Sequence, residues 1–140
     1  MEFALTPVWD SPAERRRELA ACAGVSARYG LPLTAEALSR LWEQRGEALR
    51  RSGRVEFGES VLPELVRAFC DSPYAEDGTW EETLGELVEL FYQFKNDFPI
   101  PDGDLLSAMR RVYDGPAHGT AELLADRLPE YLRGEEHENV

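Results

Sequence analysis

The sequence predicts an all-α fold, a compact single-domain bundle of five to six helices with a long central amphipathic helix at about residues 80–97. Helix start and stop signals recur along the whole chain, and apolar residues repeat at spacings of three and four. Only residues 54–57 alternate between polar and apolar side chains as a strand does. These four residues have no obvious pairing partner, so we interpret them as an extended connector. At 140 residues, the chain is long enough to bury a core without metals or disulfides.

Each predicted helix has a recognisable start. Ser11 and Thr79 begin capping boxes for the first and fourth helices, and Thr34 caps the second. Pro12 suits a first helical position, while Pro63 is tolerated in the first turn of the third helix. The expected ranges are 12–29, 35–51, 60–70, 80–97, 102–113 and 121–132.

Glycine and proline account for the predicted helix ends. Gly30 and Gly53 terminate the first two helices, and Pro73 follows the third. Pro99 prevents the fourth helix from continuing, and Gly115 stops the fifth. Pro129 should kink or split the sixth helix. We therefore expect one helical domain at 1–133 and a frayed polar tail at 134–140.

The helix predicted at 80–97 has two contrasting faces. At 100° per residue, its apolar side chains fall within an arc of about 160°; they are Trp80, Leu84, Leu87, Val88, Phe91, Tyr92, Phe94 and Phe98. An intramolecular core explains this arc better than a dimer seam, because the pattern lasts under three heptads. The sequence is compatible with both a monomer and a homodimer.

Three carboxylates, Glu82, Glu86 and Glu89, share the opposite face of this helix. A di-metal site would need them turned inward, with histidines at Glu-x-x-His spacing, and the sequence offers no such histidine. We interpret them as a solvated face and as a candidate partner surface, and we predict no metal.

The net charge of −12 comes from 27 acidic and 15 basic residues. Residues 1–70 hold ten of each sign, whereas residues 71–140 hold 17 acidic and five basic residues, so the imbalance lies in the second half. An acidic chain of this kind does not neutralise phosphate, which excludes direct binding of nucleic acid or of an anionic membrane surface. A basic protein surface is the partner that this charge favours.

Cysteine usage and the N-terminus indicate a cytoplasmic protein. Cys22 and Cys70 are not arranged as a metal-binding or redox pair, and both fall on apolar helical stretches, where we expect buried, inert thiols. The chain begins without a cationic leader, and no run of eighteen apolar residues occurs.

A few polar residues break the general pattern and form a candidate ligand set. Arg45 lies in the middle of the apolar arc of the second helix, where it is either paired internally or available to an anion. The loops at 52–58, 70–74 and 114–119 carry more polar groups than simple connectors need. The candidate ligand-binding residues are Arg45, Arg54, Asp71, Tyr74, Asp114 and His118.

These segments also resemble a known family. The stretches GLPLT (30–34), SGRVEFG (52–58), AFCDSPY (68–74), the helix at 82–96 and YDGP (113–116) are similar to small bacterial proteins classed only as a domain of unknown function. The likeness covers about residues 28–125. It implies a bacterial cytoplasmic origin and transfers no activity, cofactor or catalytic residue. Many members carry a cysteine where this chain has Ala117, which implies that this position is not an essential thiol.

The sequence favours a non-enzymatic interaction or regulatory module whose acidic second half, residues 71–140, meets a basic protein surface. A small-ligand (anion) binding protein or enzyme, with a pocket formed by the three polar loops, is the alternative. A third hypothesis is that the spaced carboxylates mimic the phosphates of a nucleic acid. No phosphate-binding glycine loop, G-x-S-x-G elbow or H-E-x-x-H motif is present, so we predict no catalytic residue and no cofactor.

Overall fold

The computed structural model describes residues 12–54 and 60–138, and these residues form six α-helices and no strand. The helices are α1 (Pro12–Ala27), α2 (Ala35–Ser52), α3 (Leu62–Phe69), α4 (Trp80–Asp97), α5 (Asp102–Asp114) and α6 (Ala121–Glu138). The prediction of an all-α bundle is confirmed. Residues 55–58 of the polar loop at 52–58 lie outside the described residues, as does the predicted cap at Ser11.

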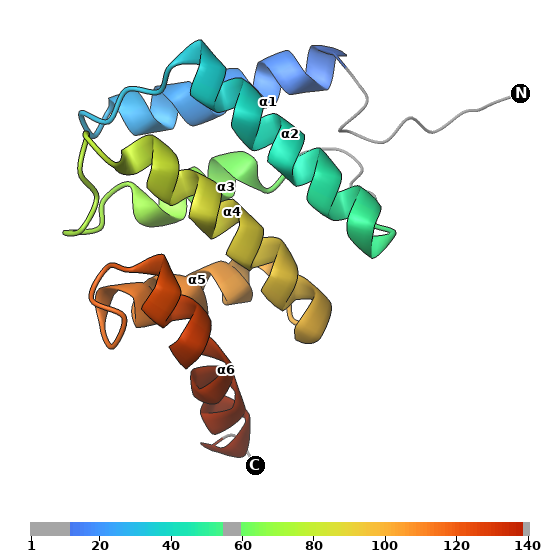
Figure 1. Ribbon diagram of the computed structural model, residues 1–140, viewed down its shortest axis with the longest axis vertical. Coiled ribbons are helices and arrows are strands. Elements are labelled where there is room, and N and C mark those ends of the chain that lie inside the picture. Colours follow the sequence, from blue (N-terminus) through green and yellow to red (C-terminus); the bar gives the residue numbers. More distant parts are fainter. Residues whose placement is uncertain (1–11, 55–59, 139–140) are drawn as a thin grey trace, which may run out of the picture.

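The helices pack in neighbouring pairs (Figure 1). Helix α2 lies along α4, α1 packs against α3, and α5 packs against α6. Helix α5 also contacts α3 and α4, while α6 contacts α4. This order leaves one side of α4 between α2 and α6.

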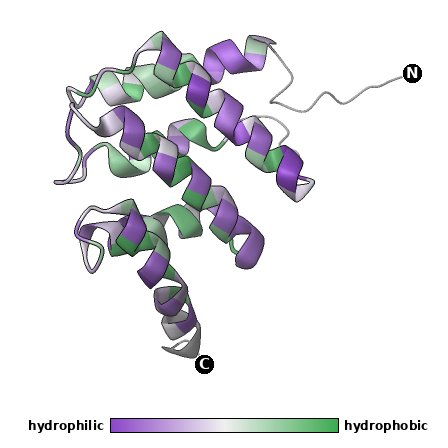
Figure 2. Ribbon diagram, in the orientation of Figure 1, coloured by the Kyte–Doolittle hydropathy of each residue, from purple (hydrophilic) through white to green (hydrophobic). Residues whose placement is uncertain are grey.

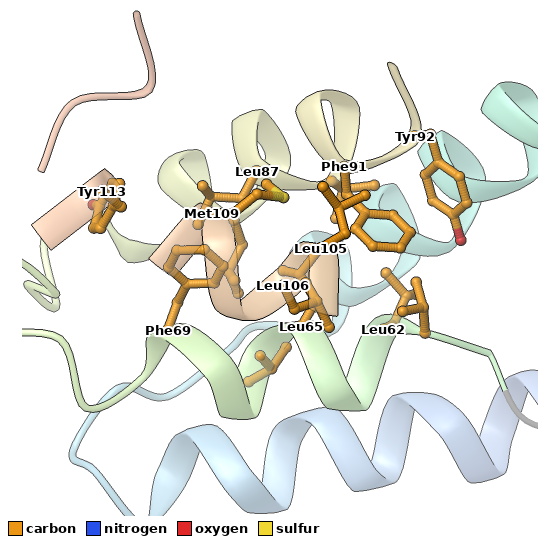
Figure 3. Packing of buried hydrophobic residues seen from close by; sticks show 14 of the residues in the cluster. Leu62, Leu65, Phe69, Leu87, Phe91, Tyr92, Leu105, Leu106, Met109 and Tyr113 are labelled. Carbon is orange, nitrogen blue, oxygen red and sulfur yellow. The ribbon is translucent and has the colours of Figure 1, made fainter. Parts of the chain in front are cut away.

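Helix α5 fills the centre of the core (Figure 3). Its Leu105 and Met109 lie against Leu87 and Phe91 of α4, and the side chains of α3 close the other side. The fully or nearly fully buried residues of α4 are Trp80, Leu84, Leu87, Val88, Phe91, Tyr92 and Phe94. The predicted apolar arc is therefore the core of a single chain and not a dimer seam.

The outer surfaces of the helices are polar. Figure 2 shows hydrophilic and hydrophobic residues alternating along α2 and α4, as amphipathic helices require. Within the described residues, no helix has both the length and the apolar character that crossing a membrane requires.

The caps of α2 match the prediction, but the cap of α4 does not. The Thr34 hydroxyl oxygen accepts a hydrogen bond from the Ala37 N–H at 3.1 Å, and Gly53 ends α2 with φ 69°. Thr79 makes no side-chain capping bond, so the capping box predicted there is wrong. Its backbone, at φ −122° and ψ 0°, is not in the extended conformation that lets an N-cap side chain reach the first turn.

Three helix boundaries differ from the expectation by two residues or more. Helix α1 ends at Ala27 rather than near Tyr29. Helix α3 begins at Leu62 rather than near Ser60, because the backbone N–H and the hydroxyl of Ser60 both donate to the buried carboxylate of Glu18. Helix α6 continues past Pro129 to Glu138, well beyond the predicted end at Leu132. Leu132 is itself buried, so packing carries the helix past the proline.

Candidate functional site

A groove of about 1050 Å³ lies where α2, α4 and the first turns of α6 meet. Its small or apolar lining residues are Ala37 and Leu41, which are buried, and Gly85, Leu90, Ala121 and Ala125, which are partly buried. Its more exposed lining residues are mostly glutamates. The groove therefore has an apolar bottom and an acidic rim.

Helices α2 and α4 meet along a line of contact that we call the seam, and they pack closely there because residue 85 is a glycine. The Gln44 side chain donates from Nε2 to the Gly85 carbonyl oxygen at 3.2 Å. A Cβ atom on Gly85 would lie 3.3 Å from Gln44 Oε1, closer than an ordinary van der Waals contact. The absence of a side chain at Gly85 thus leaves the bottom of the groove open.

Seven glutamates line the groove: Glu43 and Glu47 from α2, Glu81, Glu82, Glu86 and Glu89 from α4, and Glu122 from α6. Three of them have partners. The Glu81 carboxylate accepts the Thr34 N–H at 2.7 Å, while Arg51 reaches Glu47 at 3.5 Å and Glu89 at 3.2 Å. These contacts are solvent-exposed, and exposed ion pairs contribute little stability.

The other four groove glutamates, Glu43, Glu82, Glu86 and Glu122, form no ion pair with any residue in the described ranges. The lining includes a single arginine, Arg40, whose guanidinium pairs with Glu36 at 3.2 Å. Carboxylates concentrated over an apolar surface produce a negative potential that attracts cations. The groove can therefore accept a positively charged group.

The groove gathers every residue of the predicted partner surface. Glu82, Glu86 and Glu89 all line it, as their shared helix face implied. Sequence reasoning missed Glu43 and Glu47, because they belong to the half of the chain whose charges balance. Their spacing of four residues on an exposed helix face was the available signal.

A second acid-rich region, which we call the Arg110 corner, comprises Asp71, Ser72, Arg110 and Asp114. Arg110 donates from Nε to Asp114 Oδ2 and from Nη1 to Asp71 Oδ1, both at 2.5 Å. The Ser72 hydroxyl donates to the other oxygen of Asp114 at 2.7 Å. Here both carboxylates are paired with one arginine of the same chain.

Arg110 is the residue of this corner that sequence reasoning missed, although its spacing of four from Asp114 was visible. It also donates to the Ala68 carbonyl oxygen at 2.7 Å, which ties α5 to the end of α3. Burial alone would lower the pKa of Arg110, but its hydrogen bonds to Asp114 and Asp71 outweigh this effect and raise the pKa above its usual value. The corner is a charged clamp between α5 and the loop that follows α3.

Tyr74, His118 and Gly119 form the outer edge of the same corner. The Tyr74 ring meets the Tyr113 ring edge to face at 6.1 Å and is 38% exposed. A Cβ atom on Gly119, which has φ +75°, would lie 2.3 Å from the Tyr74 ring. The exposed His118 has φ 50°, a conformation uncommon for residues with side chains.

The six candidate ligand residues do not share one pocket. Asp71, Tyr74, Asp114 and His118 come together at the Arg110 corner. Arg45 is instead fully buried in α2, with its guanidinium carbon 4.4 Å from the centroid of the Trp42 ring.

Arg54 lies at the far end of α4. Its Nε donates to Asn96 Oδ1 at 3.0 Å and its Nη2 to the Lys95 carbonyl oxygen at 3.2 Å. Lys95 in turn pairs with Asp102 at the start of α5, at 2.9 Å. Asp114 of the corner is the last residue of that helix, 12 residues or about 18 Å further along, so Arg54 and the corner lie too far apart for one small ligand.

Both cysteines are buried and free, in agreement with the sequence analysis. Burial, followed by the nearby charge of Glu18, raises the pKa of Cys22 to about 12. Burial and then Asp71 also raise the pKa of Cys70. Raised pKa values keep thiols protonated and unreactive at neutral pH. Across the two described ranges, no group of three His, Cys, Asp or Glu side chains is placed to hold a metal ion.

Comparison with known proteins places the chain in a family. Residues 18–138 match the model of a family of unknown function, DUF6323, and the chain belongs to that family. No curated protein and no solved structure gives a significant match.

Proposed function

We propose that this member of DUF6323 is a non-enzymatic interaction module that binds a positively charged segment of another protein in the groove between α2, α4 and α6. The observation that carries the proposal is the set of four glutamates around an apolar bottom that have neither a hydrogen-bond nor an ion-pair partner among the described residues. A cationic ligand gains electrostatic attraction at the rim and buries apolar surface below it.

The Arg110 corner favours a structural role over catalysis. Its guanidinium and both carboxylates already satisfy one another, and an acid or base would need a free hydrogen-bonding position facing a substrate. The alternative pocket of six residues also loses support, because Arg45 and Arg54 lie elsewhere. The groove is thus the better candidate for binding.

The setting that suits this role is the bacterial cytoplasm. Two free, buried cysteines are common in a reducing compartment, and the sequence resembles small bacterial proteins. Direct binding of nucleic acid or membrane lipid is disfavoured by the net charge of −12.

The experiment compares two variants that remove the same number of charges. The groove triple carries Glu43→Gln, Glu82→Gln and Glu86→Gln. The matched control triple carries Glu64→Gln, Asp104→Asn and Glu130→Gln, which are exposed positions outside the groove. Each tagged protein is used to capture binders from a lysate of the source organism, and the captured proteins are identified by mass spectrometry.

The proposal predicts a protein that is captured by the wild type and by the control triple and lost by the groove triple. Its capture should weaken steeply as salt approaches physiological strength, where charges are screened over about 8 Å. Equal capture by the two triples would contradict the proposal, and so would the absence of any salt-sensitive binder.

A further inference from the structure

We infer that the segment bound in the groove is an amphipathic α-helix with small apolar residues on one face and lysine or arginine along both edges of that face. This inference rests on the proposed function and specifies its partner. It depends on how the carboxylates are arranged around the α2–α4 seam, on the shape and size of the groove, and on the absence of a strand edge.

The carboxylates form two rows on opposite sides of the seam. The Gln44–Gly85 contact marks the seam itself. Glu43 and Glu47 lie one position before and three positions after Gln44, so they flank the seam on α2. Glu82 and Glu86 hold the corresponding places around Gly85 on α4, three before and one after, and therefore flank the seam on the other side.

Two rows require cations on both edges of the ligand. Each row places its carboxylates four residues apart, about one helical turn or 6 Å. A ligand helix that carries basic residues four apart on each edge matches this repeat. A ligand with a single line of charge would satisfy only one row.

The bottom of the groove accepts a helix backbone at close range. Ala37, Leu41 and Gly85 lie along the seam, and Ala121 and Ala125 of α6 border it. Small residues at such contacts let helix axes approach to about 8–10 Å. The side chains that the ligand turns toward the seam should accordingly be small and apolar.

The volume of the groove also fits a helix. A helix about 10 Å across that rises 1.5 Å per residue fills the 1050 Å³ with about nine residues, or two and a half turns. An extended peptide usually binds by adding a strand to a sheet edge, and the described part of the chain contains no strand. A helix laid over α2 and α4 is the mode that remains.

The test uses two synthetic peptides of about 14 residues, a length at which an isolated helix is marginally stable. One contains alanine, leucine and lysine, with the lysines placed on both edges of an apolar face. The other has the same charge, with one central alanine replaced by proline to disrupt the helix. Binding to the wild type and to both triples is measured by fluorescence anisotropy, helix formation by circular dichroism, and displacement with spermidine.

The inference predicts that the helical peptide binds the wild type at least about tenfold more tightly than the proline peptide and gains helical signal on binding. The groove triple should lose at least about tenfold in affinity, while the control triple stays within about twofold. Spermidine should displace the peptide only at concentrations well above that of the protein.

The possible failures are distinct. If both peptides bind equally and both depend on the groove glutamates, the helical inference is wrong and the proposed function stands. Displacement by stoichiometric spermidine would also overturn the inference, because the groove would then prefer a small cation. If both triples bind the peptides equally, the groove is not the cation-binding surface, and the proposed function fails as well. No binding to the wild type overturns the inference.

Discussion

The groove and the Arg110 corner both collect carboxylates, but they leave them in different states. In the corner, Asp71 and Asp114 share the guanidinium of Arg110, and Asp114 also accepts from Ser72. In the groove, Glu82 and Glu86 have no ion pair among the described residues. Carboxylates that are paired within the chain hold its elements together, whereas those left without a cation are available to a ligand.

The difference follows from where the nearest arginines lie. Arg110 is half-buried between two loops and reaches both carboxylates at 2.5 Å. Near the groove, Arg40 and Arg51 pair with glutamates at its ends, and their side chains are more than half exposed. Four substitutions test this contrast, beginning with the largest expected effect.

The largest change is expected for Arg110→Gln. This variant loses two charge-assisted hydrogen bonds and leaves the two carboxylates facing each other without a cation. We expect the free energy of unfolding to fall by about 2–3 kcal/mol, measured by urea denaturation. Arg111→Gln is the control, since the exposed Arg111 side chain bonds, within the described residues, to the Tyr131 hydroxyl alone, at 3.2 Å. A similar loss in both variants would show that the corner is not a clamp.

The next effect is expected for Gly119→Ala. The new Cβ atom would enter the Tyr74 ring, and φ +75° is unfavourable for alanine. We expect a loss of about 1–2 kcal/mol in thermal or urea unfolding, because the partly exposed Tyr74 can move aside. Gly103→Ala, where nothing lies within 4 Å, should be neutral or stabilising. A neutral Gly119→Ala would contradict this description of the loop.

The pKa of Tyr113 responds to charges in both regions. Burial, then Asp114 of the corner and Glu86 of the groove, raise its pKa above 10.0, and Arg110 opposes them. The unfolded chain therefore releases this proton at lower pH than the folded chain does. Stability is complete below about pH 10 and falls as the pH rises through the folded pKa.

The measurement is unfolding as a function of pH. Tyr113→Phe should flatten the alkaline fall in stability, and the exposed Tyr29→Phe serves as the control for removing a tyrosine hydroxyl. Glu86→Gln should lower the pKa of Tyr113 by removing one of the charges that raise it. An alkaline profile of Tyr113→Phe identical to that of the wild type would refute this link.

The smallest effect is expected in the stability of the groove triple. Glu82 and Glu86 are four residues apart on one helix, so their repulsion costs about 0.2–0.5 kcal/mol. Glu82 also lies in the first turn of α4, where a negative charge is favourable, so the groove triple should stay within about 0.5 kcal/mol of the wild type. The control triple should lose a few tenths of a kcal/mol, since Glu64 and Asp104 favour the first turns of α3 and α5. A loss of more than about 1 kcal/mol in the groove triple would mean that these glutamates support the fold.

Local sequence signals predicted the helices well. The cap at Thr34, the terminator Gly53 and the apolar arc of α4 depend on residues within a few turns of one another. The capping box at Thr79 failed although its residue types were correct, because the preceding loop holds the Thr79 backbone in another conformation. The continuation of α6 past Pro129 is accompanied by the burial of Leu132, a tertiary contact that helix propensity does not take into account.

Part of the candidate site could be predicted from the sequence. Glu82, Glu86 and Glu89 share a face because the helix repeat is fixed by backbone hydrogen bonds. That Glu43 joins them depends on α2 packing along α4 through Gln44 and Gly85, which are 41 residues apart. The grouping of Asp71 with His118 could be proposed from the sequence, while the placement of Arg45 and Arg54 away from them could not be foreseen.

The sequence alone determined an all-α chain with an acidic second half and a central helix that separates apolar from charged residues. Only the tertiary structure decided which carboxylates are neutralised and which are not. Arg110 reaches Asp71 across 39 residues of chain, and Arg51 reaches Glu89 across 38. Periodicity is set within a few helical turns, whereas ion pairing is set by which helices pack side by side.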